Sequence, residues 1–398
     1  MKTKLLITTS SFPRNQSDFK GFIYLLADKL KQYHDVFILA PQSENSLAYE
    51  EIEGLKIYRH AVTPFGDFGI AYDSGILPNI KKNPFLILVV PFLILSQTWA
   101  IRNIVRKENI TAINAHWIIP QGFSAVLYKV FFNKKIKILV SALGSDINFF
   151  DNFVGNVLKK FILNRCNEIT VMSNYFRDKV KSLGYPREVY VYPLGVDTNN
   201  FHPSKYKQSL KEQFAIKGEM ILFVGWIIEL KGIRYLIHAM KAIIENHPET
   251  KLVVVGQGTL MDEMKQKSRE LGIEKNVVFA GRVSDSDLPS YFATSDIFIL
   301  PSFSEGFPVT VQEALSSETI AVVSDIPVFT DWAKEVDFVH IVRCGNSEDI
   351  AKKINEIILR ESELADSKRR AREYTVQNFD WEIIAKKFSD LILKMERV

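Results

Sequence analysis

The sequence predicts an α/β protein built from two successive arrays in which short apolar strands alternate with amphipathic helices. Two observations carry this prediction. Strand-like apolar runs recur along the whole chain with helical stretches of ten or more residues between them, which is typical of mostly parallel sheets. The alternation is interrupted once, at residues 195–207, where Gly, Asp, Asn and Pro gather as in an interdomain linker.

The length and apolar content fit two domains. At 398 residues with 47% apolar composition, the chain can bury a large core. We expect an N-terminal domain at 1–200 and a C-terminal domain at 201–379, each with a parallel sheet and helices on both faces. The amphipathic helix at 380–398 is expected to pack back on the first domain.

Charge and cysteine content exclude several classes of protein. Fifty basic and 46 acidic residues leave a net charge of +4, which is too slight to indicate a nucleic-acid partner. Cys166 and Cys344 lie far apart, so they form neither a disulfide framework nor a metal-ligand cluster. The apolar run at 5–7 is too short for a signal peptide, and a reducing cytoplasm is the expected location.

In the first domain, the predicted strand at 4–9 leads through a loop to Gly21, which begins a helix that ends near residue 32. Residues 65–83 are punctuated by glycines and are expected to form a surface loop, with a helix following from about residue 84. Further strands are expected at 36–40, 55–60, 110–115, 137–142, 168–173 and 189–192.

Two polar residues follow strands of this domain. His116 comes directly after the strand at 110–115, where open α/β sheets place ligand-binding residues, although a histidine in this position is often structural. Asp146 follows the strand at 137–142 within the sequence LGSD, and it can serve either as a helix cap or as a ligand. Both interpretations stay open for each residue.

The second domain repeats the alternation, with strands expected at 221–224, 252–255 and 276–280. Lys231 and Gly232 precede a helix with apolar residues at helical spacing, so a lysine, a glycine turn and helix amides together indicate a phosphate site. The Asp285 and Asp287 pair resembles a metal-binding carboxylate pair, but its place before a helix at 288–293 favours helix capping.

The stretch at 300–323 is the most informative part of the chain. An apolar strand ends there and passes through a small-residue loop into a helix, in whose first turn Pro308 is favourable. Glu305 lies in the loop and Glu313 lies about a turn and a half into the helix. Two carboxylates beside helix N-terminal amides suit the hydroxyl groups of a polyol ligand, whereas the alternative is two solvated glutamates.

One apolar run, at 84–95, is followed by basic residues. It is shorter than the about 20 residues that a spanning helix needs, and Pro91 interrupts it. The segment at 84–100 is therefore interpreted either as a buried or dimer-facing helix, or as a monotopic contact with anionic lipid.

Several of these stretches resemble the retaining nucleotide-sugar glycosyltransferases of family four. They are NAHWIIPQG at 114–122, YPLGVDTNNFHP at 192–203, the Lys231-Gly232 pair and, most specifically, PSFSEGFPVTVQEAL at 301–315. The resemblance covers almost the whole chain. It implies the GT-B fold, in which two Rossmann-like domains face each other.

The resemblance also implies residue roles. Lys231 would contact the donor diphosphate, Glu305 would lie by the donor sugar, and Glu313 would hold the ribose. Together with His116, Lys231 and Glu305 form the implied catalytic set, and Asp146 is assigned to the acceptor side. The implied donor-binding residues are Gly21, Trp226, Arg282, Val283, Gly306, Phe307 and Glu313.

Three positions depart from the family pattern. Trp226 replaces a phosphate-binding arginine, Pro327-Val328 replaces a glycine pair, and Leu143 replaces a histidine or arginine. The first two positions concern contacts with the donor, and the third concerns contacts with the acceptor.

The resemblance implies a metal-independent retaining hexosyltransferase without a cofactor, acting on a glycan or lipid-linked acceptor in cell-surface polysaccharide synthesis. The cytoplasmic face of a membrane is the expected location, with no nucleic-acid partner. A nucleotide-sugar epimerase of the same architecture and a non-catalytic nucleotide-sugar-binding protein are the alternatives.

Overall fold

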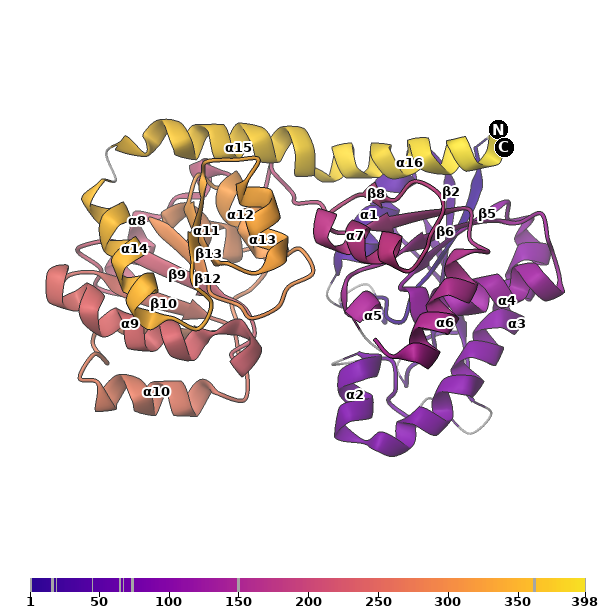
Figure 1. Cartoon of the computed structure of the whole chain (residues 1–398), viewed down its shortest axis with the longest axis horizontal. Helices are drawn as coiled ribbons and strands as arrows, with labels where there is room; N and C mark the ends of the chain where they lie inside the picture. The colour runs from indigo at the N-terminus through magenta and orange to yellow at the C-terminus, as the bar shows by residue number, and fades with distance from the viewer. Residues whose placement is uncertain are drawn as a thin grey trace. The chain divides into compact units, whose positions relative to one another are not determined.

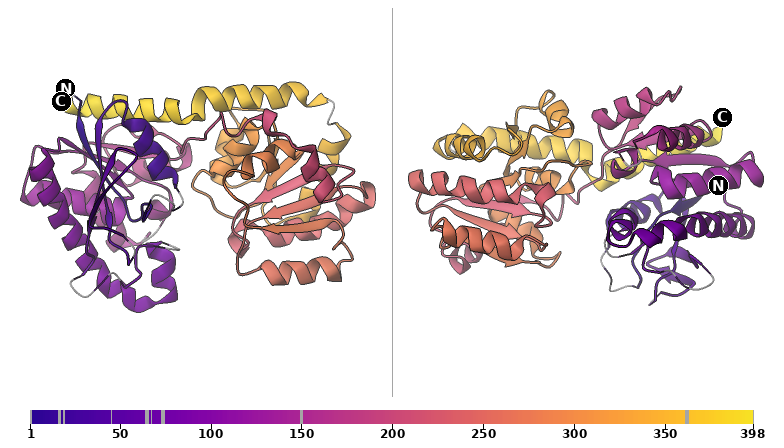
Figure 2. Two further views of the ribbon diagram at one scale, coloured as in Figure 1. Left: turned by 180° about the vertical axis from the view of Figure 1, so that it is seen from behind. Right: turned by 60° about the horizontal axis from the view of Figure 1, so that its bottom comes forward.

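The computed structural model describes residues 2–397 except 16, 17, 19, 45, 64, 65, 67, 73, 74, 149, 150, 361 and 362. The chain divides into two compact units, which are described separately below. The first consists of Met1–Leu194 and Trp381–Val398, and the second consists of Gly195–Asp380. Figure 1 colours the chain from indigo at the N-terminus to yellow at the C-terminus, and Figure 2 adds two further views.

The first unit is built on an eight-stranded sheet in the order β3-β4-β2-β1-β5-β6-β7-β8. Every pair of neighbouring strands is parallel except β3 and β4, which form an antiparallel edge. The strands are β1 (Lys4–Thr8), β2 (Asp35–Pro41), β3 (Tyr49–Ile52), β4 (Leu55–His60), β5 (Ala112–His116), β6 (Lys137–Ser141), β7 (Glu168–Val171) and β8 (Tyr190–Val191).

Helices cover both faces of this sheet. Helix α1 connects β1 to β2, towards one edge of the sheet, whereas α4, α6 and α7 connect the strands from β5 to β8, towards the other edge. Because crossovers between parallel strands are right-handed, α1 lies on one face of the sheet and α4, α6 and α7 lie on the opposite face. The helices are α1 (Phe22–Leu30), α2 (Ile76–Lys82), α3 (Val90–Glu108), α4 (Phe123–Phe131), α5 (Ser145–Asn148), α6 (Phe153–Leu163), α7 (Asn174–Ser182) and α16 (Trp381–Arg397), with short helical turns at Pro84–Val89 and Ile118–Gly122.

Helix α16 belongs to the core of the first unit, although it is the last element of the chain. Its apolar side chains share one buried cluster with α1 and strands β1, β2 and β4. Each such side chain contributes about 1.5–3 kcal/mol when it is fully buried, so this helix is a large part of the unit's stability. The residues of α16 in the cluster are Trp381, Ile384, Ala385, Phe388, Leu391, Ile392 and Met395.

Three elements of the first unit differ from the sequence prediction. Helix α2 occupies the end of the region expected to be a surface loop at 65–83, of which residues 65, 67, 73 and 74 lie outside the described part. Strand β3 was not predicted, because its sequence YEEI carries a single buried residue.

The third difference concerns the apolar run. Pro84–Val89 continues into α3, so that Pro84–Glu108 forms 25 helical residues, long and apolar enough by length and composition to cross a membrane. The expectation that this run is too short to span was wrong. Pro91 does not interrupt the helix, because it lies in the first turn of α3, where a missing N–H is tolerated.

The second unit has a six-stranded, fully parallel sheet in the order β11-β10-β9-β12-β13-β14. The strands are β9 (Met220–Val224), β10 (Lys251–Val255), β11 (Val277–Gly281), β12 (Ile297–Leu300), β13 (Ile320–Ser324) and β14 (Val339–Val342). The strand order reverses between β9 and β12, which is where open α/β sheets form their ligand-binding crevice.

Helices also cover both faces of this second sheet. Helices α9 and α10 connect the strands from β9 to β11, towards one edge of the sheet, and α12 and α13 connect the strands from β12 to β14, towards the other edge. Right-handed crossovers therefore place α9 and α10 on one face of the sheet and α12 and α13 on the opposite face. The helices are α8 (Gln208–Gln213), α9 (Ile233–Asn246), α10 (Met261–Glu270), α11 (Leu288–Thr294), α12 (Val309–Ser316), α13 (Pro327–Ala333), α14 (Ser347–Leu359) and α15 (Ala365–Phe379), with short turns at Pro203–Lys205 and Glu229–Lys231.

The segment interpreted as a linker at 195–207 is part of the second unit. The Val196 N–H donates to the Phe379 carbonyl at 2.8 Å, and the Thr198 hydroxyl donates to Asp380. Arg372 also donates to the carbonyl of Thr198, at 3.3 Å. These contacts fix the segment against the end of α15, so the units divide at Leu194 and Gly195 rather than at residue 200.

Candidate functional site

The carboxyl ends of the central strands of the second unit gather most of the candidate residues. Strand β9 pairs in parallel with both β10 and β12, so the loops after these three strands leave the same edge of the sheet. The loop after β9 carries Trp226 and Lys231, and the loop after β12 carries Glu305. Helix α12, which follows the second loop, carries Glu313.

Close backbone packing fixes the position of Lys231. Gly232 has a φ of 68°, and a Cβ on it would lie 2.0 Å from the carbonyl oxygen of Pro301, so only glycine fits there. The Phe303 N–H donates to the carbonyl of Leu230 at 2.9 Å. The loops after β9 and β12 are therefore joined on both sides of Lys231.

Lys231 and Glu305 form an ion pair across this junction. The Lys231 Nζ donates to Glu305 Oε1 at 2.6 Å, and the two side chains are 19% and 8% exposed. A charge-assisted hydrogen bond between partly desolvated groups holds both side chains more firmly than a surface pair would. The structure thus brings together two residues that the sequence separates by 74 positions.

Glu313 is half-buried in the second turn of α12. Burial is the main cause that raises the pKa of its carboxyl from 4.5 to about 8, and the negative charge of Asp285 adds to the shift. At neutral pH this side chain is therefore largely protonated and can donate a hydrogen bond as well as accept one.

The sequence analysis did not predict that the charge of Asp285 acts on Glu313. The Asp285 and Asp287 pair was interpreted as a helix cap, but the side chain of Asp287 makes no capping hydrogen bond to α11. The carboxylate of Asp287 instead accepts from the Ser284 hydroxyl at 2.7 Å, and Asp285 acts on Glu313 through its charge. The capping interpretation was therefore wrong for the side chain of Asp287, which bonds to the turn at Ser284 instead.

Other candidate donor-binding residues lie on the same edge of the second sheet. Trp226 follows β9, and its indole is 57% exposed. Arg282 and Val283 follow β11, with Arg282 exposed and Val283 half-buried. The loops after β9 and β10 touch, since a Cβ on Gly256 would lie 1.9 Å from the Gly225 carbonyl oxygen. Trp226 therefore projects from a tightly packed loop.

Phe307 takes a different place from Gly306 beside it. The Phe307 ring is buried against Trp332 and Phe379, with ring centroids 5.2 and 5.6 Å apart. Pro327, which replaces part of a glycine pair, begins helix α13, the helix that carries Trp332. The side chain of Phe307 thus anchors the loop through its buried ring contacts. A ligand can therefore contact this part of the loop only through the backbone of Phe307 and of half-buried Gly306.

In the first unit, His116 is buried at the end of β5. Ser141 Oγ donates to Asn114 Oδ1 at 2.8 Å, which leaves the Asn114 amide N–H to donate to His116 Nε2 at 3.3 Å. Burial lowers the pKa of His116 to about 3, so the imidazole is neutral. Its Nδ1 is buried without a hydrogen-bond partner among the described residues, and its expected role at the donor stays a prediction.

Asp146 is buried as well, and backbone groups occupy its carboxylate. Its Oδ1 accepts from the N–H of Leu143 and of Gly144 at 3.1 and 3.0 Å, and its Oδ2 accepts from the N–H of Ile118 at 2.7 Å. Burial raises the pKa of this carboxyl, while the backbone N–H groups act in the opposite direction. Asp146 therefore joins the loops after β5 and β6, and its assignment to the acceptor side stays a prediction.

Gly21 is the residue before α1, as expected, and it is half-buried. Its φ of −66° is one that any residue adopts, so backbone conformation alone does not require glycine there. Among the described residues no group of three or more His, Cys, Asp or Glu side chains is arranged to hold a metal ion.

Comparisons with known proteins agree with this architecture. The sequence matches the family description "Glycosyltransferase Family 4" over residues 22–200 and "Glycosyl transferases group 1" over residues 205–375. The sucrose-phosphate synthase structure from Thermosynechococcus elongatus matches all of both chains with a TM-score of 0.79 at 17% identity, which shows the shared fold.

Two curated relatives match over shorter stretches. Mannosylfructose-phosphate synthase of Agrobacterium fabrum is 32% identical over 148 residues, which are 35% of this chain and 33% of the relative. The UDP-Gal:alpha-D-GlcNAc-diphosphoundecaprenol alpha-1,3-galactosyltransferase of Escherichia coli is 35% identical over 147 residues, 35% of this chain and 38% of the relative. The matched part thus spans 33% and 38% of the two relatives. With both family matches and two Rossmann-like units, the chain belongs to the family-4 glycosyltransferases of GT-B fold.

Proposed function

We propose that this protein transfers a sugar from a nucleotide-sugar donor to a glycan or lipid-linked acceptor with retention of anomeric configuration. The observation that carries the proposal is the Lys231–Glu305 pair, 2.6 Å apart at the edge where β9 and β12 end. In this scheme Lys231 supplies a cation for the leaving diphosphate, and Glu305 beside it supplies a carboxylate for the sugar.

Lys231 contacts the leaving group in this scheme. The donor diphosphate is anionic and competes with Glu305 for the same ammonium group, so a phosphate oxygen bound there lies beside the Glu305 carboxylate. Such a contact stabilises charge that develops as the bond to the diphosphate breaks, a contribution of about 3–4 kcal/mol for one well-placed donor.

Glu305 acts next to the sugar in this scheme. As the glycosidic bond breaks, positive charge develops on the anomeric carbon, and a carboxylate released from Lys231 stabilises it and orients hydroxyl groups. The acceptor hydroxyl attacks from the face that the diphosphate leaves, and the diphosphate takes up the acceptor proton. The configuration at the anomeric carbon is thereby retained without a covalent glycosyl-enzyme intermediate.

Glu313 holds the ribose of the donor. Its raised pKa, about 8, keeps a proton on the carboxyl at neutral pH, and a neutral acid offers one donor and one acceptor to a pair of ribose hydroxyls. Trp226, which has an exposed aromatic face on the same edge, packs against another part of the donor.

The acceptor side of the proposal rests on relatives. The Escherichia coli relative is named for a diphosphoundecaprenol-linked acceptor, which supports a lipid-linked acceptor and a place in cell-surface polysaccharide synthesis. We place the protein in the cytoplasm, attached to the inner face of the membrane through residues 84–100, where such an acceptor is found. Neither nucleic acid nor a metal ion is needed by the reaction.

A thermal-shift screen with UDP-, GDP- and ADP-sugars tests donor binding first. A true donor raises the melting temperature by mass action, by an amount equal to about 2.7 kcal/mol at a hundred times its Kd. The Lys231→Ala variant should show a smaller shift with the same compound. A flat response of the wild type to all three classes contradicts the proposal.

The product then tests the mechanism. Transfer should persist in EDTA, and NMR of the product from an α-linked donor should show an α-linkage. Loss of transfer in EDTA or a β-linked product contradicts the proposed chemistry. Release of free nucleotide and sugar from the donor alone, at high turnover, favours an epimerase instead.

A further inference from the structure

Helix α3 of the first unit presents one continuous exposed stripe that changes from apolar to basic along its length. Leu88, in the turn before the helix, and Phe92, Leu95 and Trp99 are each more than half exposed. Arg102 and Arg106 continue the same stripe, since all these positions follow one another at intervals of three or four residues. We call these six residues the α3 stripe.

The opposite face of α3 is packed into the first unit. Leu93, Gln97 and Ile101 are fully buried. The Thr98 hydroxyl donates to the carbonyls of Ile94 and Ser124, which ties α3 to α4. A helix held in this way cannot turn all its sides to lipid, so its length does not make it a spanning helix; an in-plane or tilted contact is the geometry available to it.

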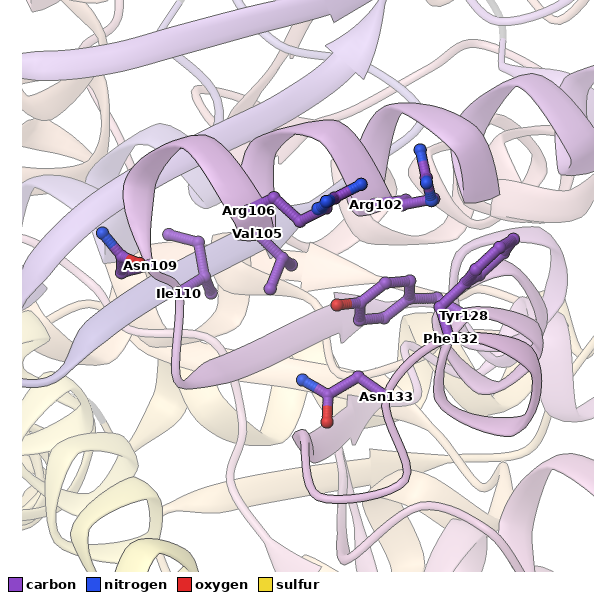
Figure 3. A pocket seen from close by; sticks show the side chains of 8 residues that line it. All are labelled: Arg102, Val105, Arg106, Asn109, Ile110, Tyr128, Phe132 and Asn133. Carbon is purple, nitrogen blue, oxygen red and sulfur yellow. The ribbon is translucent and has the colours of Figure 1, made fainter.

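A pocket of about 500 Å³ lies at the basic end of the stripe. Figure 3 shows the side chains that line it, with Arg102 and Arg106 on α3, Tyr128 on α4 and Asn133 just beyond α4. The lining contains two guanidinium groups and no acidic residue. Among the described residues, no carboxylate pairs with either arginine. The positive charge of this pocket is thus left for an outside anion.

Aromatic contacts hold the arginine at the boundary between the two parts of the stripe. The Arg102 guanidinium lies 4.7 Å from the centre of the Trp99 ring and 5.4 Å from that of Phe132. Tryptophan is enriched at the level where lipid acyl chains meet headgroups. Along the helix, Phe92 lies about 10 Å on one side of Trp99, whereas Arg102 and Arg106 lie about 5 and 10 Å on the other side. If the helix is tilted with its first turns towards the acyl chains, this order matches the layers of a membrane surface.

We propose that the pocket formed by Arg102, Arg106, Tyr128 and Asn133 binds the phosphate group of an anionic membrane lipid while the apolar end of the α3 stripe lies among acyl chains. Guanidinium groups bind phosphate oxygens through paired hydrogen bonds, and the Tyr128 hydroxyl and the Asn133 amide add uncharged donors. The inference rests on the proposed membrane attachment, and it names the lipid group that this attachment recognises.

Vesicle binding by the full-length protein tests the headgroup site. Vesicles containing phosphatidylglycerol are compared with vesicles of phosphatidylcholine alone. Arg102→Gln with Arg106→Gln should weaken binding to the anionic vesicles about 25-fold, from about fivefold for each basic residue near such a surface. The control pair Lys217→Gln with Lys275→Gln removes two exposed charges from the second unit and should change binding by no more than about twofold.

A second pair of variants tests the apolar end. Phe92→Ser with Leu95→Ser should release the protein from both kinds of vesicle, whereas Leu359→Ser, an exposed leucine of the second unit, should not. Because all the altered side chains are exposed or line the surface pocket, we expect every variant to keep the wild-type unfolding temperature within about 2 °C.

Several results overturn the inference. If the arginine variant and its lysine control bind anionic vesicles equally, the pocket is not a headgroup site. If Phe92→Ser with Leu95→Ser binds vesicles as well as the wild type, the apolar end of the α3 stripe does not insert among acyl chains. If calorimetry shows inorganic phosphate binding to the pocket as strongly as the vesicles do, the site serves a soluble anion. If the wild type binds no vesicle, the membrane attachment fails too, while the thermal shift with nucleotide sugars still decides the transferase proposal separately.

Discussion

Both sheets carry polar residues at the carboxyl ends of their strands, but the burial and the contacts of these residues differ between the two units. In the first unit, His116 ends β5 and Asp146 follows β6. Both are buried, with hydrogen bonds to His116 Nε2 and to both Asp146 carboxylate oxygens. In the second unit, Lys231 and Glu305 follow β9 and β12 and meet each other near the surface. Residue type and place at a strand end therefore do not predict which side chains are buried and which meet near the surface, whereas the contacts in the fold show it.

The strongest way to break this comparison is to remove Lys231. We expect Lys231→Ala to lower donor turnover at least ~100-fold, because one lost contact to a developing anion costs about that much and Trp226 offers no charge to replace it. Turnover is measured as nucleotide release. Lys211→Ala is the matched control, since Lys211 forms a similar partly buried pair with Asp296 at 2.9 Å. Equal losses in both variants contradict a catalytic role.

Asp146→Ala tests the other side of the comparison. The substitution leaves three backbone N–H groups without their partner, so the free energy of unfolding of the first unit should fall by about 3 kcal/mol. Urea unfolding measures the change, and Asp178→Ala, an exposed aspartate of the same unit, should stay within about 0.5 kcal/mol of the wild type. Unchanged stability of Asp146→Ala, with impaired transfer, makes Asp146 a ligand instead.

The pH dependence of stability tests Glu313. Between pH 4.5 and about 8 the unfolded chain loses the Glu313 proton while the folded protein keeps it, so this group's contribution to stability is full below pH 4.5 and is lost as the pH rises towards 8. The Glu313→Gln variant has no such proton to lose. Relative to this variant, the free energy of unfolding of the wild type should fall by up to about 1.4 kcal/mol for each unit of pH increase between 4.5 and about 8. A stability difference that stays constant from pH 5 to 8 means an ordinary carboxylate.

Trp226→Arg is expected to have the smallest effect and sharpens the account of the donor site. If the exposed indole packs against the donor, arginine should weaken donor binding modestly, and Trp226→Phe should preserve it. Calorimetry measures both affinities. A tenfold gain for arginine, about 1.4 kcal/mol, instead indicates that Trp226 only replaces a lost phosphate contact.

The sequence predicts well where strands end, but it predicts poorly which side chains contact one another across the fold. Most strands were expected within one or two residues, and Lys231 was expected beside Gly232 at the start of a helix, because local periodicity and turn chemistry decide such features. The contact of Lys231 with Glu305 joins two loops that are distant in sequence, so no local pattern contains it. The burial of Phe307 likewise depends on Trp332 and Phe379, two residues from elements further along the chain.

A double-mutant cycle on Lys231 and Glu305 tests the central claim most directly. Donor turnover, as kcat/KM, is measured for Lys231→Ala, Glu305→Ala and the double variant. If the pair acts as one catalytic unit, the double variant should lose little more than the worse single variant, with a coupling energy of about 1–3 kcal/mol. If the two losses multiply, the residues act independently, and the pair seen in the structure is not the centre of the reaction.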